Sequence, residues 1–374
     1  MKILTVAGSR AQAIGLSRLS NRIREAHEEV FVFCPPIDDL PAEWLWQGGL
    51  GLPRPRYQWV LRADTAGRRA FELTIRLERA VRRERPDVVL VCGGSEASMA
   101  GALVAAQLHF ASAHLEAGLR APRVCAADDV NRRVADRLAT FRFCATPAGA
   151  AQLEREGIRE GVYVVGDPAL DALAALRAQA DDHEEVLKEV GLQSRGYYLA
   201  VVSLPERRQG IGKLTAWLAA LEGLDLPVAL LLHPRAALVM HEASISPPGE
   251  VRLLEPLDPP GMLALEAEAK ALVTDSPAVQ REAIFLGVPC VAVGEPAWPE
   301  AGLSGAEPAG IAAALRSAQD VPARAGQGDP EGHRGAALRA AHNAGDQPFG
   351  DGRASERIVE ILSGGISPAA PQET

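Results

Sequence analysis

The sequence predicts an α/β protein made of two domains, each with a parallel sheet. The chain has 374 residues, which is too long for one ordinary hydrophobic core and suits two. Short β-branched runs alternate with longer amphipathic segments, and such alternation implies right-handed crossovers between parallel strands. The alternation stops in a polar helical segment at Ala172–Arg195 and then starts again, so we place the domain junction there.

The first predicted domain covers residues 1–171. Its strands are predicted over Ile3–Ala7, Val30–Cys34, Asp87–Val91, Ala113–Glu116, Phe141–Ala145 and Val162–Val165. Its helices are predicted over Ala11–Ala26, Thr65–Glu84, about 95–108, Val130–Leu138 and Ala148–Glu156. Each strand is therefore followed by a turn and a helix, as a parallel sheet requires.

The second predicted domain covers residues 172–349. Its strands are predicted over Tyr198–Val202, Val228–Leu232, Val251–Leu254, Ala271–Thr274 and Cys290–Val293. The Gly- and Ala-rich stretch 322–346 is predicted as loop and loosely packed helix. A final short helix is predicted at Ser355–Leu362, and the Gly- and Pro-containing residues 363–374 are predicted to be a disordered tail.

Composition narrows the class of protein. Hydrophobic residues make up 47% of the chain and charged residues 23%, as in globular proteins, and the net charge of -9 disfavours nucleic acid and acidic membranes. No apolar run is long enough for a signal-peptide core or a membrane span. The scattered cysteines indicate reduced core residues of a cytoplasmic protein rather than a metal site or disulfides: Cys34, Cys92, Cys125, Cys144 and Cys290.

Two glycine-containing turns follow strands in the first half. In parallel sheets, ligands bind at the carboxyl ends of strands, near the point where the strand order reverses. Gly8-Ser9-Arg10 offers free helix N–H groups and a guanidinium to an anion, although this motif alone is weak evidence and also fits a plain turn with a surface arginine. Gly94 and Ser95 belong to the second turn, where a ligand can approach the backbone and Ser95 can cap a helix.

The segment 114–120, HLEAGLR, carries the strongest local signal. Glu116 ends an apolar strand where no structural need for a charge is evident, so it is a candidate general base or sugar ligand. Asp128 and Asp129 follow, and either of them suits a helix N-cap. The functional alternative places one of them beside Glu116, where paired carboxylates divide acid and base roles.

The second half offers an anion site and two further polar candidates. Asp275 and Ser276 follow an apolar strand, and the helix start at Ser276 suits a diphosphate. Glu282 lies two turns further on and can reach a ribose, although a lone Glu usually lies on a solvated helix face. His233 follows another strand, where a single histidine is more often structural than catalytic.

In their order and spacing these blocks resemble the UDP-N-acetylglucosamine 2-epimerase family, chiefly its non-hydrolysing bacterial type. The similar blocks include HLEAGLR (114–120), DDVNRR (128–133), VVGDPALDAL (164–173), LVTDSPAVQREAIFLGVPCV (272–291) and PFGDGRASERI (348–358). The resemblance implies two Rossmann-like domains in the GT-B arrangement, with a UDP-sugar in the cleft between them. It also implies that the last helix, at about 350–362, packs back on the first domain, and that the protein forms a homodimer.

The family's chemistry removes the C2 proton of the sugar with loss of UDP, then adds UDP back while C2 receives a proton on the other face, without a redox cofactor. By this resemblance Glu116 and an acidic partner, Asp128 or Asp129, are catalytic. The residues implied to bind the UDP-sugar are Gly8, Arg10, Gly94, Ser95, Arg120, His233, Asp275, Ser276 and Glu282.

Several family positions are changed in this chain. The family's catalytic aspartate falls on Gly94, its first-helix lysine on Gly15, and its histidine on Ser203 or Leu204. The glycine pair after Ser276 is Pro277-Ala278, and the arginine-bearing loop has become residues 296–300, PAWPE. These departures fall at ligand-facing positions of the family, where a missing general base costs about 10²–10⁴-fold in rate.

The leading hypothesis is therefore a UDP-N-acetylglucosamine 2-epimerase-like isomerase that acts on a UDP-sugar, with a role in supplying cell-envelope polysaccharide. One alternative is a nucleotide-sugar-binding protein that has lost catalysis and regulates or partners an enzyme. Another is an enzyme of altered chemistry, such as a hydrolysing epimerase or a sugar transferase. No nucleic acid, membrane or metal partner is expected.

Overall fold

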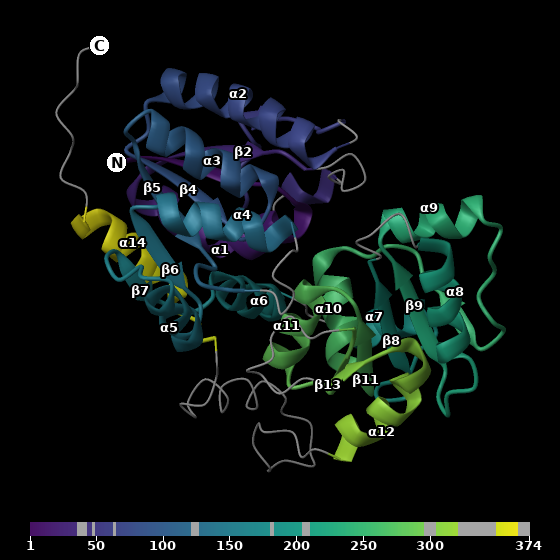
Figure 1. The fold of residues 1–374 in the computed structure, drawn as a ribbon. Helices are drawn as coiled ribbons and strands as arrows, with labels where there is room; N and C mark the ends of the chain where they lie inside the picture. The colour runs from purple at the N-terminus through teal and green to yellow at the C-terminus, as the bar shows by residue number, and fades with distance from the viewer. Residues whose placement is uncertain are drawn as a thin grey trace. The chain divides into compact units, whose positions relative to one another are not determined.

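A computed structural model shows two compact units in the chain (Figure 1). It describes residues 1–35, 43–46, 49–62, 65–120, 127–179, 183–203, 210–294, 304–320 and 349–365. Unit 1 comprises Met1–Ala175 with Gln347–Thr374, and unit 2 comprises Leu176–Asp346. The division falls inside a helix, α6 (Pro168–Gln179), a few residues after the predicted junction.

Unit 1 contains a seven-stranded sheet in which every strand pair is parallel, in the order β3-β2-β1-β4-β5-β6-β7. The order runs outward in both directions from β1 and β4, which is the Rossmann pattern. Its strands are β1 (Lys2–Ala7), β2 (Glu28–Phe33), β3 (Tyr57–Gln58), β4 (Val88–Cys92), β5 (Ala111–Leu115), β6 (Phe141–Cys144) and β7 (Val162–Val164).

Helices cover both faces of this sheet because successive strand side chains point to opposite faces. Leu4 and Val6 of β1 pack in one cluster with Leu73 of α2 and Val104 of α3. On this side α2, α3 and α4 lie next to one another (Figure 1), while α1 packs against α14. The helices are α1 (Arg10–Ala26), α2 (Ala66–Glu84), α3 (Glu96–Gln107), α4 (Ala127–Leu138), α5 (Pro147–Arg155) and α14 (Ala354–Gly365), with a short 3-10 helix at Glu43–Trp46.

Unit 2 repeats the plan with a six-stranded parallel sheet in the order β10-β9-β8-β11-β12-β13. Its strands are β8 (Tyr198–Val202), β9 (Val228–Leu232), β10 (Val251–Leu253), β11 (Ala271–Thr274), β12 (Cys290–Val293) and β13 (Ser304–Ala306). Its helices are α7 (His183–Glu189), α8 (Gly210–Leu221), α9 (Pro234–Glu242), α10 (Pro259–Glu268), α11 (Pro277–Leu286) and α12 (Ile311–Asp320), with a 3-10 turn at Pro308–Gly310.

The core of unit 2 is divided by the same alternation along β8. Tyr198 and Ala200 pack with Trp217 of α8 on one face of the sheet. Leu199 packs on the other face, in a cluster that includes Leu265 of α10 and members of α7 and α11. The two faces are therefore closed by different helices, and α10 and α11 share one side.

Every strand predicted from the sequence is present, with ends within two residues of the predicted ones. Two strands were missed. β3 has only two residues, which is too short for a hydrophobic period, and β13 reads Ser-Gly-Ala, a composition with low β-propensity. The predicted tail 363–374 was placed too early, because residues 363–365 form the end of the helix Ala354–Gly365. The stretch 322–346, residues 366–374 and Cys125 lie outside the described residues.

The other four cysteines are buried. Among the described helices, none combines the length and apolar character needed to cross a bilayer.

The C-terminal helix α14 is tied to unit 1 by a carboxylate on α6. Asp171 accepts hydrogen bonds from the backbone N–H groups of Ala354 and Ser355, at 3.3 Å and 2.6 Å. These N–H groups open α14, so they have no partner inside their own helix. Asp171 therefore works as an N-cap supplied from a distant part of the chain.

We expect Asp171→Ala to lower the free energy of unfolding by about 1–2 kcal/mol, the usual value of a helix N-cap. Urea denaturation followed by circular dichroism measures the change. Glu360→Ala, on the exposed side of α14, is the matched control and should change stability by less than about 0.5 kcal/mol. An equal effect of both substitutions would contradict the capping role.

Candidate active site

The strand order of unit 1 reverses between β1 and β4, and one side chain bridges their carboxyl ends. Gln12 Oε1 accepts a hydrogen bond from the Gly8 N–H at 2.8 Å, and Gln12 Nε2 donates to the Cys92 carbonyl at 2.8 Å. An amide can do both, whereas a glutamate would present a second acceptor to that carbonyl. Gln12 therefore holds together the two turns that follow these strands.

Two helices start side by side at this corner. Ser9 caps α1 by accepting from the Gln12 N–H, and Ser95 caps α3 by accepting from the Ser98 N–H, both at 3.2 Å. A Cβ on Gly8 would lie only 2.6 Å from Ser95 Oγ, so only glycine fits this approach. Arg10 is the first residue of α1 and therefore lies at the same corner. The structure thus brings together three of the predicted site residues, Gly8, Arg10 and Ser95.

Glu116 lies at the same corner in a strained conformation. It follows β5 with a φ of 60°, in the left-handed region that costs a residue with a side chain about 1 kcal/mol or more. Its Oε2 lies 2.8 Å from the point that a Cβ on Gly93 would occupy. Such strain concentrates at functional sites, which supports the prediction that this carboxylate is functional.

Asp128 lies against the next residue of the same turn. A Cβ on Gly94 would collide with the carbonyl oxygen of Asp128, and Asn131 Nδ2 donates to the Gly94 carbonyl at 2.8 Å. Hence the start of α4 fills the space that a side chain at Gly94 would need. Desolvation by the surrounding protein raises the pKa of the Asp128 carboxyl, and the negative charge of Glu96 raises it further. The positive charge of Arg132 lowers this pKa.

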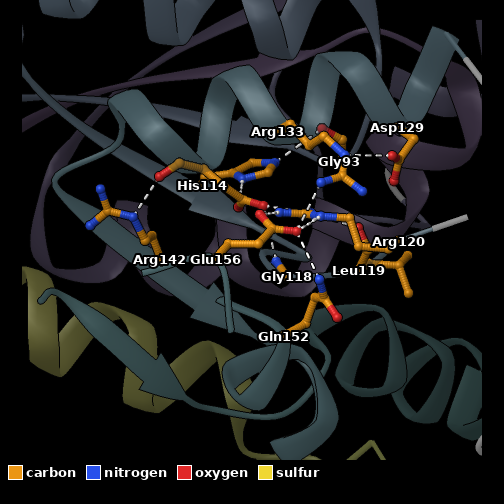
Figure 2. A network of polar contacts seen from close by, with 11 residues as sticks. Gly93, His114, Gly118, Leu119, Arg120, Asp129, Arg133, Arg142, Gln152 and Glu156 are labelled. Carbon is orange, nitrogen blue, oxygen red and sulfur yellow. Dashed lines mark hydrogen bonds and ion pairs between the residues drawn. The ribbon is translucent and has the colours of Figure 1, made fainter. Parts of the chain in front are cut away.

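A buried network lies beneath this corner (Figure 2). His114 Nδ1 lies 2.7 Å from Asp136 Oδ1, and its Nε2 lies 3.0 Å from the Gly93 carbonyl oxygen. Both partners are acceptors, so both hydrogen bonds form only when the ring carries two protons. The buried ring of His114 thus links the Gly93 turn to Asp136 through its two nitrogens.

The carboxylate of Asp136 collects further donors from the loop after Glu116. It accepts from the Gly118 N–H at 3.2 Å and pairs with Arg120 at 2.7 Å. Burial alone would raise the pKa of Asp136, but the charges and hydrogen bonds of His114 and Arg120 hold it below its ordinary value. The network therefore fixes both sides of the strained residue.

Arg120 and Asp129 are members of the same network. Glu156 binds the Arg120 guanidinium through two hydrogen bonds of 2.8 and 2.7 Å, and it also accepts from Arg133 at 3.0 Å. Arg133 in turn pairs with the buried Asp129 at 2.8 Å. In this structure Arg120 and Asp129 support the loop and α4, so direct roles for them in binding and catalysis stay predictions.

The order of strands in unit 2 reverses between β8 and β11, and again one side chain joins their ends. Asp275 Oδ1 accepts from the Ser203 N–H at 2.7 Å. Thr274 Oγ1 donates to the Val201 carbonyl at 2.8 Å and accepts from the Ser276 N–H at 3.0 Å. The predicted Asp275 is therefore a bridge between strands as well as a neighbour of the helix start.

The start of α11 is the predicted diphosphate site. Ser276 stands at its N-cap but makes no side-chain capping bond, and Pro277 contributes no N–H group at the first helical position. The later N–H groups of the first turn remain for an anion. Glu282 lies further along the same helix, half-buried, and His233 lies between β9 and α9 with its N–H on the Val202 carbonyl at 2.9 Å.

Some of the predicted differences from the family lie outside the described residues, namely Leu204 and residues 296–300. The sequence interpretation also missed Asp136 and Glu266, two buried carboxylates. The available signal was the helical period, because both residues fall on the apolar side of their helices. Asp136 lies one turn before the buried Ala139, and Glu266 lies one turn after the buried Leu263.

Comparison with known proteins identifies the family. The model of the family described as UDP-N-acetylglucosamine 2-epimerase matches residues 39–363. The chain belongs to the UDP-N-acetylglucosamine 2-epimerase family. A UDP-N-acetylglucosamine 2-epimerase homolog of Methanococcus maripaludis is 31% identical over 82% of this chain and 87% of its own length. The UDP-2,3-diacetamido-2,3-dideoxy-D-glucuronate 2-epimerase of Pseudomonas aeruginosa is also 31% identical, over 97% and 99%.

A solved structure supports the same conclusion. The UDP-GlcNAc 2-epimerase of Methanocaldococcus jannaschii, in complex with UDP-GlcNAc and UDP, matches with a TM-score of 0.82 and 25% identity, over 97% of this chain and 99% of that one. The predicted fold class, α/β with two Rossmann-like domains of the GT-B type, is thereby confirmed.

We expect Asp136→Asn to lower the free energy of unfolding of this family member by about 3–5 kcal/mol at neutral pH, because it removes the buried anionic partner of the Arg120 guanidinium and of the His114 ring. The folded state lowers the pKa of Asp136, so its contribution is complete above the unfolded pKa and is lost as the pH falls through the folded value. The difference between variant and wild type should therefore shrink below about pH 4.

Chemical denaturation at a series of pH values measures this difference. Arg137→Gln, at an exposed position of the same helix, is the control and should change stability by less than about 0.5 kcal/mol. A loss that stayed constant down to acid pH would argue against the charged pair.

Proposed function

We propose that the protein is a UDP-sugar 2-epimerase that interconverts UDP-N-acetylglucosamine and UDP-N-acetylmannosamine. One observation carries the proposal beyond family membership. Glu116 and Asp128 flank the Gly93-Gly94 turn, where the strand order of unit 1 reverses: the carboxylate of Glu116 lies beside Gly93, and the backbone and Cβ of Asp128 lie beside Gly94. Parallel sheets bind ligands at such points, and paired carboxylates suit acid and base roles.

The reaction needs a base on one face of the sugar ring and an acid on the other. A base takes the C2 proton, the bond between C1 and the diphosphate oxygen breaks, and UDP leaves with the electron pair to give a glycal. UDP then adds back to C1, and C2 receives a proton on the opposite face. The sugar is neither oxidised nor reduced overall, so the proposal includes no redox cofactor.

We assign the base role to Glu116 and the second acid–base role to Asp128. The raised pKa of Asp128 favours a protonated form that can deliver a proton. Asp129 is buried in its pair with Arg133, which makes it the weaker candidate of the two for proton transfer.

The nucleotide is assigned to the start of α11, with Ser276 and the N–H groups after it on the diphosphate and Glu282 on the ribose. Arg10, at the start of α1, is proposed as a phosphate-binding residue of unit 1. A second sugar is a candidate beside N-acetylglucosamine. The relative from Pseudomonas aeruginosa, which matches nearly the whole chain, makes a diacetamido glucuronate the second substrate to test.

Three further properties belong to this proposal. We place the enzyme in the cytoplasm, as a homodimer, in the supply of cell-envelope polysaccharide. Membership of a family of named epimerases supports catalysis over the alternative of a nucleotide-sugar-binding protein without activity.

Proton NMR of the protein with UDP-N-acetylglucosamine in deuterated water tests the function. The expected result is a mixture of the two epimers with deuterium at C2. If UDP binds to saturation but neither candidate UDP-sugar exchanges its C2 proton, the proposed enzymatic activity is refuted and the non-catalytic alternative is supported. Release of UDP with no epimeric UDP-sugar would indicate the altered chemistry.

We expect Glu116→Gln to slow C2 exchange by about 10²–10⁴-fold, because the amide keeps the shape of the side chain but cannot take a proton. UDP affinity should be unchanged in isothermal titration calorimetry. Glu154→Gln, on the exposed side of α5, is the control and should exchange at the wild-type rate. Full activity of Glu116→Gln would remove Glu116 from the mechanism.

A further inference from the structure

Unit 2 buries a carboxyl group that the proposed reaction does not use. Glu266 on α10 is fully buried, and neither of its side-chain oxygens has a hydrogen-bond donor among the described residues. A buried carboxylate without a donor costs far more free energy than a neutral carboxylic acid. The environment of Glu266 therefore favours the protonated form of its carboxyl group.

The facing group on α11 is another carboxyl. The side chains of Glu266 and Glu282 are within hydrogen-bond contact, and α10 packs against α11. Two carboxylates are both acceptors, so this contact is a hydrogen bond only when one of them holds a proton. Burial raises the pKa of both groups, Glu266 well above its ordinary value, and the hydrogen bond favours the ionised form of Glu282. Glu266 is thus the donor and Glu282 the acceptor.

No nearby group replaces that proton. The charge of Arg281 lowers the pKa of Glu282, but this effect is smaller than the rise in pKa that burial causes. Burial raises the pKa of Cys290 to about 12, so its thiol stays neutral. The hydroxyl of Tyr197 donates to the Leu265 carbonyl at 2.6 Å. The charged and titratable groups around the pair therefore leave a single shared proton between two carboxyls.

We infer that Glu266 is a positioning residue that holds Glu282 as the acceptor for the ribose hydroxyls of a uridine nucleotide, and that this makes nucleotide binding depend on pH. The inference rests on the proposed role of Glu282. One oxygen of Glu282 accepts from Glu266, which leaves the other for a ribose hydroxyl. When Glu266 loses its proton, the negative charges of the buried Glu266 and the half-buried Glu282 repel one another and Glu282 is displaced.

UDP binding to the full chain, measured by calorimetry between about pH 6 and pH 9, tests this inference, because buried glutamates titrate in that range. Wild-type affinity should fall as the pH rises. Glu266→Gln supplies an N–H donor that does not titrate, so its affinity should stay constant with pH. Glu266→Leu removes the donor, so its affinity should be about tenfold to a hundredfold weaker at low pH.

Glu255→Gln, at an exposed position before α10, is the control and should keep the wild-type pH dependence. An identical pH dependence of UDP affinity in wild type and Glu266→Gln would overturn the inference. So would a Glu266→Leu variant that binds as tightly as wild type at low pH.

Unfolding without ligand separates this inference from the proposed function. A carboxyl whose folded pKa is raised stabilises the protein below its unfolded pKa, and that contribution is lost as the pH rises through the folded pKa. Wild-type stability should therefore decline with rising pH more than that of Glu266→Gln. If no variant binds UDP, the proposed function fails, while the denaturation curves still decide whether the pair holds a proton. Equal curves for wild type and Glu266→Gln would refute the pair itself.

Discussion

The whole arrangement depends on how each sheet is held at the point where its strand order reverses. There, the helices after two neighbouring strands leave toward opposite faces, so the ends of the strands have few neighbours of their own. Unit 1 joins them through Gln12, which bonds the turns after β1 and β4, and unit 2 joins them through Asp275. These side chains keep the turns in place while leaving helix N–H groups for a ligand.

Charged side chains of unit 1 also hold the turns after the strands in place. Glu116 sits in the left-handed region, and a strained residue persists only where its surroundings hold it. Before it, the ring of His114 contacts the Gly93 carbonyl; after it, Gly118 and Arg120 bond Asp136. A buried network of this kind contributes little net stability, but it leaves one conformation available. Hydrogen bonds and ion pairs on both sides of Glu116 thus hold the proposed base in position.

The sequence was sufficient for the strands, because buried parallel strands give continuous apolar runs that are hard to mistake. It was not sufficient for β3 or β13, whose pairing depends on neighbours rather than on their own composition. The same division applies to the site. HLEAGLR marks Glu116 directly, but the engagement of Arg120 with Asp136 and Glu156 joins residues from three elements. Spacing in the sequence does not reveal such contacts.

The departures from the family come with changes in packing. A Cβ on Gly15 would lie 3.2 Å from the Cβ of Ala169, so α6 approaches α1 where the family has a lysine. At Gly94 the backbone of Asp128 takes the space of the family's aspartate. Each small residue therefore allows a neighbouring element to move in, and at Gly94 that element is the start of α4, which carries Asp128. An acidic residue thus adjoins the turn at which the family has its aspartate.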